Sequence, residues 1–112
     1  MARTPTNFAN TTQLSTTAAD VVPAVATNAS AVVRKVSFYN SGTSTRTVTV
    51  YVVAAAGTAG TTNILKQKAI TPGDTWNCLE IQGEVLSAGM KVQAAQDVGT
   101  DVNVNCSGTI VT

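Results

Sequence analysis

Residues 31–53 predict two β-strands joined by a short Ser/Gly/Thr connection. In residues 46–53, valines alternate with polar or aromatic residues at every second position: Val48, Val50 and Val52 against Thr47, Thr49 and Tyr51. Successive side chains of a strand point to opposite faces, so this period of two indicates one buried and one solvated face. In residues 31–40 the alternation fails at Arg34, which falls on the apolar face. We favour a β-bulge near Arg34 over a strand that is covered on both faces.

Short strands separated by turn residues continue along the rest of the chain. We expect them at 13–22 (ended by Pro23), 64–70, 75–79, 85–86, 90–95 and 102–110. No stretch has a convincing helical period, which excludes a parallel sheet with crossover helices. Aromatic residues make up only 4% of the chain, so the core must consist of Val, Ile, Leu and Ala. The predicted fold is all-β: one antiparallel β-sandwich or jelly-roll-like domain of about seven or eight short strands.

The sequence divides into an N-terminal arm, residues 1–12, and a β-sandwich domain, residues 13–112. The arm has no periodicity, and Phe8 is its only large apolar anchor. Two interpretations are open for the arm. It is either a frayed terminus or a segment that becomes ordered on a neighbouring molecule, with Phe8 as its plug.

The charge pattern argues against nucleic acid as a partner. The formal net charge is +1, and the seven basic residues are dispersed among six acidic ones. No run resembles the basic footprint that phosphate neutralisation requires. Only 12% of residues are charged, about half the usual share of roughly 25%. A surface so poor in charge suits a protein that is packed against neighbours.

No membrane or export segment is predicted. No apolar run approaches the roughly 20 residues that a membrane helix requires. Residues 1–5 lead into polar residues rather than the apolar core of a secretory signal. We therefore expect a protein that is made in the cytoplasm and used without secretion.

The sequence argues against catalysis. It contains no histidine, so a serine or cysteine nucleophile lacks its usual base. Lys66 and Lys68 stand at strand spacing and are expected to be solvated. The carboxylate pairs Asp74–Glu80 and Glu80–Glu84 are better explained by solvated turns than by glycoside hydrolysis. Asp97 and Asp101 lack the spacing and number of ligands of an EF-hand calcium loop. We expect no enzyme activity, no cofactor and no metal.

Four further side chains have two interpretations each. Cys78 and Cys106 are more readily explained as free, partly buried thiols than as a disulfide, and their spacing does not fit zinc. Trp76 could form a sugar-stacking platform with Tyr51. We favour Trp76 in the sandwich core and Tyr51 at a subunit contact.

Several motifs follow one another in a recognisable order: V-P-A at 22–24, A-V-V-R-K-V-S-F-Y-N-S-G at 31–42, I-T-P-G-D-T-W at 70–76, L-S-A-G-M-K-V-Q-A at 86–94 and V-N-V-N-C-S-G-T-I at 102–110. This order resembles the small all-β virion structural proteins of tailed bacteriophages, with their VPAG, APGET and L-x-A-G-D-x-I segments. The resemblance spans residues 14–110. The chain departs from the pattern at Thr27–Asn28, where glycine is common, and at Met90, where an acidic residue is common.

The resemblance implies a virion structural protein that is assembled in the host cytoplasm, and we favour a capsid decoration (cement) protein. Its implied partners are the major capsid protein or other virion proteins and further copies of itself, as a dimer or trimer. The expected contact residues are Phe8, Leu14 and Tyr51, with loops 54–62 and 97–101 as alternative surfaces. The alternatives are a neck, tail or fibre-associated accessory protein, or a surface carbohydrate-binding module that uses Tyr51 and Trp76.

Overall fold

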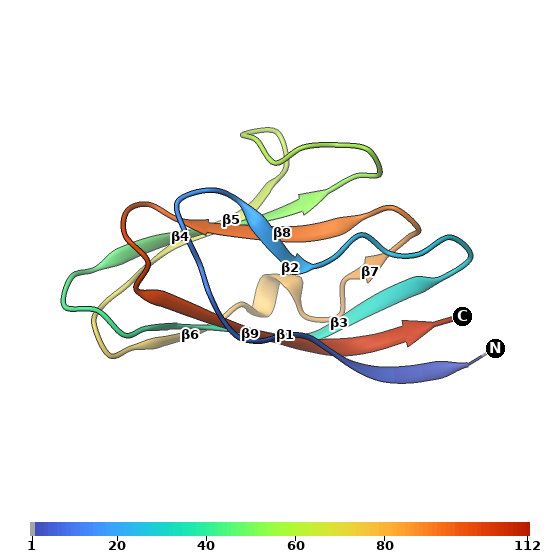
Figure 1. Ribbon diagram of the computed structural model, residues 1–112, viewed down its shortest axis with the longest axis horizontal. Coiled ribbons are helices and arrows are strands. Elements are labelled where there is room, and N and C mark those ends of the chain that lie inside the picture. The colour runs from blue at the N-terminus through green and yellow to red at the C-terminus, as the bar shows by residue number, and fades with distance from the viewer. Residues whose placement is uncertain (1) are drawn as a thin grey trace.

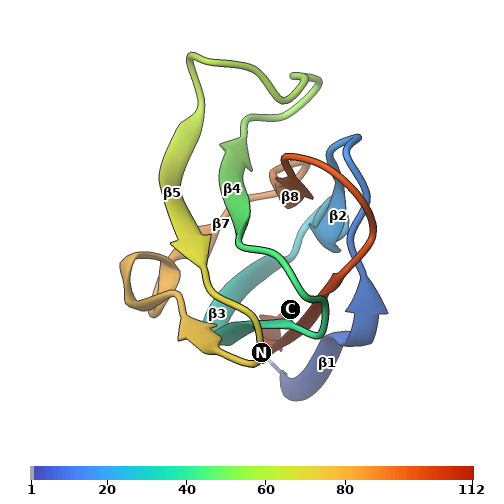
Figure 2. The ribbon, with the colours of Figure 1, turned by 90° about the vertical axis from the view of Figure 1, so that its left-hand side faces the viewer.

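The computed structural model describes residues 2–112, which form two antiparallel sheets packed face to face (Figures 1 and 2). Nine strands and one short 3-10 helix follow in chain order: β1 (Arg3–Gln13), β2 (Ala19–Val22), β3 (Ser30–Asn40), β4 (Arg46–Val53), β5 (Ile64–Ile70), β6 (Thr75–Asn77), η1 (Leu79–Ile81), β7 (Val85–Leu86), β8 (Lys91–Gln96) and β9 (Val102–Val111). The molecule is elongated, with principal extents of 46 × 26 × 19 Å. The prediction of an all-β sandwich is confirmed.

The strand order is that of a jelly roll. Sheet A runs β1-β9-β3-β6, with β7 also paired to β3, and sheet B runs β2-β8-β4-β5. Each early strand thus lies beside a late one: β1 pairs with β9 and β2 with β8, while β3 pairs with β6 and β7 and β4 pairs with β5. This strand order is obtained when one long antiparallel hairpin is rolled up into two sheets, and it is the double Greek key of jelly-roll domains.

The core between the sheets is mostly aliphatic, as the composition predicts, but it also contains two aromatic residues. Its largest fully buried side chains are mostly valines, with Phe38, Ile81 and Leu86. The alternation in β4 is confirmed for its valines: Val48 and Val50 are fully buried, and Val52 packs against the core from a half-buried position. The opposite face is less solvated than expected, because Thr49 is only 8% exposed. Trp76 is 7% exposed and its ring stacks on Phe38, with ring centroids 5.3 Å apart. Trp76 therefore fills the core, which confirms the interpretation favoured from sequence.

The bulge expected in β3 is present. The pairing of β3 with β9 shifts between Val33↔Gly108 and Lys35↔Ser107, so Arg34 is the extra residue. Val33 and Val36 are both buried, whereas Arg34 and Lys35 are both exposed. The bulge changes the phase of the strand and keeps Arg34 out of the core.

The N-terminal segment differs from the expected arm. Residues 3–13 form β1, an edge strand of sheet A that pairs with β9 from Arg3↔Val111 to Gln13↔Asn103. Without β1, the backbone groups along that side of β9 would have no strand partner, and the core would lose Ala9, which is 6% exposed. The boundary predicted at residue 12 therefore lies inside a strand of the sandwich.

Gly108 of β9 permits this packing. A Cβ at position 108 would collide with the carbonyl oxygen of Val32 and would lie 2.7 Å from Cε2 of Phe8. Phe8 is half-buried and packs against the core. The absence of a side chain at 108 therefore gives the Phe8 ring its place and allows β3 to approach β9 closely.

We predict that Gly108→Ala lowers the free energy of unfolding by about 1–3 kcal/mol, because the added methyl overpacks a site bounded by backbone. The matched control is Gly60→Ala. A Cβ at 60 meets no atom within 4 Å, and Gly60 does not have a positive φ in the left-handed range. Urea denaturation of both variants measures the difference. Equal stability of the two variants would contradict the close approach at Gly108.

Candidate functional site

The three contact residues expected from sequence lie in different environments. Leu14 is 2% exposed and belongs to the core, and its backbone N–H donates to the Val102 carbonyl at 2.8 Å. Phe8 packs into the same domain above Gly108. Both side chains stabilise their own sandwich instead of projecting from an arm, so the structure corrects the surface role expected of them. Tyr51 lies half-buried on the outer face of sheet B, in register with Ile64 and Gln93.

Tyr51 and Trp76 do not form a shared platform. Tyr51 belongs to the outward-facing set of β4 in sheet B, and Trp76 faces the core from β6 of sheet A. A sugar ring cannot stack on a side chain that is 7% exposed. The carbohydrate-binding pair considered from sequence is therefore not assembled in this fold.

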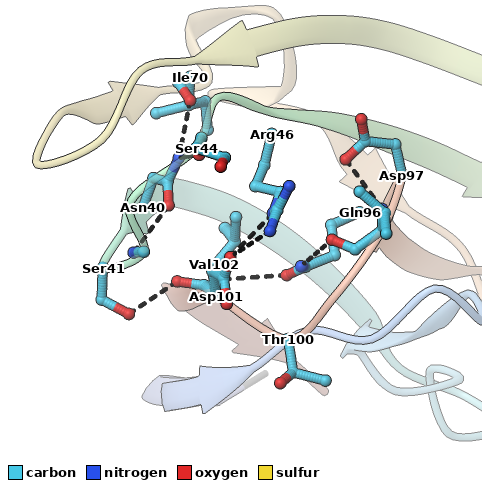
Figure 3. Close-up of polar contacts among 12 residues, drawn as sticks. Asn40, Ser41, Ser44, Arg46, Ile70, Gln96, Asp97, Thr100, Asp101 and Val102 are labelled. Atoms are coloured by element: carbon cyan, nitrogen blue, oxygen red, sulfur yellow. Dashed lines mark hydrogen bonds and ion pairs between the residues drawn. The ribbon is translucent and has the colours of Figure 1, made fainter.

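A polar cluster ties together the loops at the end of the sandwich away from the two termini (Figures 1 and 3). Arg46 at the start of β4 meets the Asp101 carboxylate, with Nη2 at 2.7 Å and Nε at 2.8 Å from Oδ2. The backbone carbonyl of Asp101 accepts from the N–H and the hydroxyl of Ser41 at 2.9 and 2.8 Å. These contacts join the β3–β4 and β8–β9 loops.

Two buried amides complete the cluster. Asn40 is fully buried. Its Nδ2 donates to the carbonyls of Ser44 and Ile70 at 2.8 Å each, and its Oδ1 accepts from the N–H of Gly42 at 3.0 Å. Gln96 is 3% exposed, donates to the Val98 carbonyl and accepts from the Val102 N–H. Every buried side-chain nitrogen and oxygen within residues 2–112 has a partner. The cluster is thus a fully satisfied structural network.

Four of the five acidic residues considered for catalysis or calcium have side-chain contacts nearby. Asp97 accepts from the Thr47 and Val98 N–H groups, and Asp101 binds Arg46. Asp74 accepts from the Thr71 hydroxyl at 3.0 Å, and Glu80 lies 3.7 Å from Lys66. In the part of the chain that the structure describes, no three His, Cys, Asp or Glu side chains gather as a metal site. Within the same residues, no helix is long and apolar enough to cross a membrane.

We predict that Asn40→Ala destabilises the fold by about 2–4 kcal/mol, because it leaves several buried backbone groups without partners, each costing about 1–3 kcal/mol. Asn77→Ala is the control, since Asn77 is exposed on the outer face of sheet A. Thermal unfolding monitored by circular dichroism measures both variants. A loss of stability as large for Asn77→Ala would show that the effect does not come from the buried network.

The two cysteines are unpaired and buried. In sheet A, Cys106 is in register with Val36, and the N–H of Cys78 donates to the Val36 carbonyl on the other side of β3. Strand β3 therefore lies between them, and two interstrand spacings of about 4.8 Å put their backbones beyond the ~7 Å limit for a disulfide. Burial raises the pKa of the Cys106 thiol to about 12 and also raises the pKa of Cys78. Free thiols, favoured from sequence, are confirmed.

We predict that neither thiol reacts readily with a thiol reagent at pH 8 in the folded protein, whereas both react in urea. The raised pKa values keep both groups as neutral thiols in the fold, and the thiolate is the reactive species. The same shifts oppose folding at alkaline pH: stability is unaffected below the unfolded pKa near 9 and declines as the pH rises from there towards 12. Ellman titration at pH 8 with and without urea checks the reactivity, and urea denaturation at a series of alkaline pH values checks the stability. Rapid labelling of two thiols in the native state would contradict the burial.

The outer face of sheet A, which was not among the sites expected from sequence, carries a regular grid of polar side chains. Cross-strand pairs from β3 and β9 bring Tyr39 beside Asn103, Ser37 beside Asn105 and Lys35 beside Ser107. The signal was present in the alternation at 102–110, where the residues between the buried Val102, Val104, Cys106 and Gly108 are all polar. That these polar residues lie next to Arg34 and Lys35, the two exposed cations of the bulge, follows only from the register of β3 with β9.

No protein-family model matches the sequence, and no curated protein matches it. Among solved structures, the fold is similar to a chain from the structure of infectious bursal disease virus, Gx strain. The two share 13% identity at a TM-score of 0.49, over 97% of this chain and 31% of the viral chain. This chain thus spans about a third of the viral chain, and similarity at this level assigns no function.

Proposed function

We propose that this protein is a non-enzymatic structural component of a bacteriophage particle, a capsid decoration (cement) protein that binds the assembled head. The observation that carries the proposal is the jelly-roll strand order, β1-β9-β3-β6 over β2-β8-β4-β5. Viral capsid domains use this architecture, and so do lectin domains. The order of sequence motifs across residues 14–110 resembles phage virion proteins and supports the first of these classes.

Such a protein acts through linkage. A ligand that binds only the assembled shell stabilises it by RT ln(1 + [L]/Kd), without any chemical step. A rigid protein binds more tightly than a flexible one with the same contacts, because it loses little conformational entropy on binding. The hydrogen bonds and the ion pair that join the loops around Asn40 and Asp101 supply that rigidity at one end of the sandwich.

The proposed shell contact is the β4–β5 loop together with the apolar residues at its base. Residues 54–63 stand away from the sandwich (Figures 1 and 2) and carry only small and polar side chains. At the start of β5, Ile64 and Leu65 are 36% and 37% exposed, and Ile64 lies opposite Tyr51. Tyr51, Ile64 and Leu65 form the shell-contact patch, which takes over the role first expected of Phe8 and Leu14.

Strand addition is disfavoured as the mode of contact at the two long sheet edges. Ala2 and Thr112 exchange backbone hydrogen bonds. In an antiparallel pair, the backbone N–H and C=O of successive residues point alternately towards and away from the partner strand. The backbone of Pro5, three residues after Ala2, therefore faces the free edge of β1. Proline offers no N–H there. At the edge of sheet B, Lys66 and Lys68 share the face of Val50 and Val48 yet are exposed. Such lysines hinder pairing with another strand, so contact through side chains and loops is favoured.

Further copies of the chain are the second proposed partner, in a dimer or trimer, because closed symmetric assembly is the norm for such proteins. A neck, tail or fibre-associated role is the alternative within the virion. Copy number separates these possibilities, since a decoration protein follows the number of capsid subunits and an accessory protein has a small fixed number.

We predict near-stoichiometric abundance relative to the major capsid protein when density-purified particles are quantified by mass spectrometry. We also predict that Tyr51→Ala weakens rebinding to stripped heads by about tenfold or more, the loss expected for a central aromatic contact. Tyr39→Ala, on the opposite outer face, is the matched control and should rebind normally. A small fixed copy number would move the protein to the neck, tail or fibres, and absence from particles would refute the virion role.

A further inference from the structure

We propose that the outer face of sheet A binds an acidic carbohydrate, with Arg34 and Lys35 holding a sugar carboxylate. This inference does not rest on the virion role. It begins with the bulge in β3, which exposes two consecutive basic residues between the buried Val33 and Val36. In a regular strand, consecutive side chains point to opposite faces. Here both cations line one shallow depression of about 660 Å³, together with Asn105 and Ser107 of β9.

The depression is cationic and lacks acidic groups. Its lining contains no Asp or Glu: Pro5, Thr6, Asn7, Asn10, Arg34, Lys35, Asn105, Ser107, Gly108 and Thr109. Within residues 2–112 the ion pairs are Arg46–Asp101 and Lys66–Glu80, so Arg34 and Lys35 have no anionic partner. Two adjacent unpaired cations favour an anion, and the guanidinium fork of arginine matches the two oxygens of a carboxylate.

Hydrogen-bonding groups continue along the face from this depression. Asn105 also lines a second depression of about 190 Å³, which contains Tyr39 and Asn103. None of the side chains of Ser37, Tyr39, Asn103, Asn105 and Ser107 forms a hydrogen bond within the described part of the chain. Each asparagine offers two donors and an acceptor, and each hydroxyl offers both functions. Sugar hydroxyl groups require such mixed partners.

Tyr39 supplies the aromatic surface. It is 44% exposed and is the only large apolar side chain among the exposed residues that line the two depressions. An aromatic ring with a polar tip can cover the C–H face of a sugar while its hydroxyl remains solvated. Tyr39 therefore takes the aromatic role that was considered from sequence for Tyr51 and Trp76. Tyr51 lies on the opposite sheet, and Trp76 lies on the same sheet as Tyr39 but faces the core.

Two other classes of ligand fit this face less well. Nucleic acid binding draws its affinity from many phosphate contacts, and the two depressions together offer only Arg34 and Lys35. Stable protein interfaces have an apolar, aromatic-rich centre from which lysine and serine are depleted. This face has hydroxyl and amide groups at its centre, which is the composition that a glycan can pair with.

The test is titration of the full-length protein with an oligomannuronate, followed by calorimetry and by NMR shifts of the backbone amides. We expect saturable binding with shifts at Arg34, Lys35, Tyr39 and Asn105. Arg34→Gln and Tyr39→Ala should each weaken binding by about tenfold. Lys68→Gln is the control. Lys68 lies on sheet B, is exposed and forms no ion pair within the described residues. Unchanged thermal unfolding of each variant shows that the fold is retained.

Three further probes make the outcome decisive. A neutral gluco-oligosaccharide of the same length should bind at least about tenfold more weakly, since it lacks the carboxylates. Equal binding of that neutral sugar, of poly-glutamate or of single-stranded DNA would overturn the assignment to acidic carbohydrate. So would the absence of saturation at about 10 mM ligand, or full binding by Arg34→Gln. Tyr51→Ala should bind the sugar normally. A failure of the sugar-binding proposal can therefore be distinguished from a failure of the proposed shell-contact patch.

Discussion

The pairing of β3 with β9 is the interaction on which the rest of the structure depends. These two strands are the inner strands of sheet A, and their register positions β1 on one side and β6 and β7 on the other. The bulge at Arg34 lies in this pair. It allows Val33 and Val36 to face the core together, and it exposes Arg34 and Lys35 in the same step. A single extra residue thus fixes both the packing of the core and the charge of the outer face.

From this pair the two faces of the sandwich acquire different surfaces. Outside sheet A lie cations, amides and hydroxyls around Tyr39, while outside sheet B Tyr51 stands beside the exposed Ile64 and a projecting loop. The end with Asn40 and Asp101 is closed by internal hydrogen bonds. A protein with a rigid body and two chemically distinct faces can attach to a shell through one face and leave the other accessible.

Much of the fold could be predicted from the sequence because its strands obey a period of two. The valines of β4, the bulge at Arg34 and the burial of Trp76 all follow from local pattern and residue chemistry. The edge strand β1 could not be predicted, because its polar sequence carries no alternation and its partner lies about a hundred residues away. The buried role of Phe8 depends on Gly108 for the same reason. The polar face required the cross-strand register, which no local window contains.

Cross-strand nuclear Overhauser effects between β3 and β9 would test the central claim most directly. The account predicts contacts that pair Val33 with Gly108 and Lys35 with Ser107, with Arg34 unpaired between them. A regular ladder in which Arg34 pairs with Ser107 would contradict it. That register would separate Arg34 and Lys35 onto opposite faces, and it would remove the basis for both the packed core and the cationic surface.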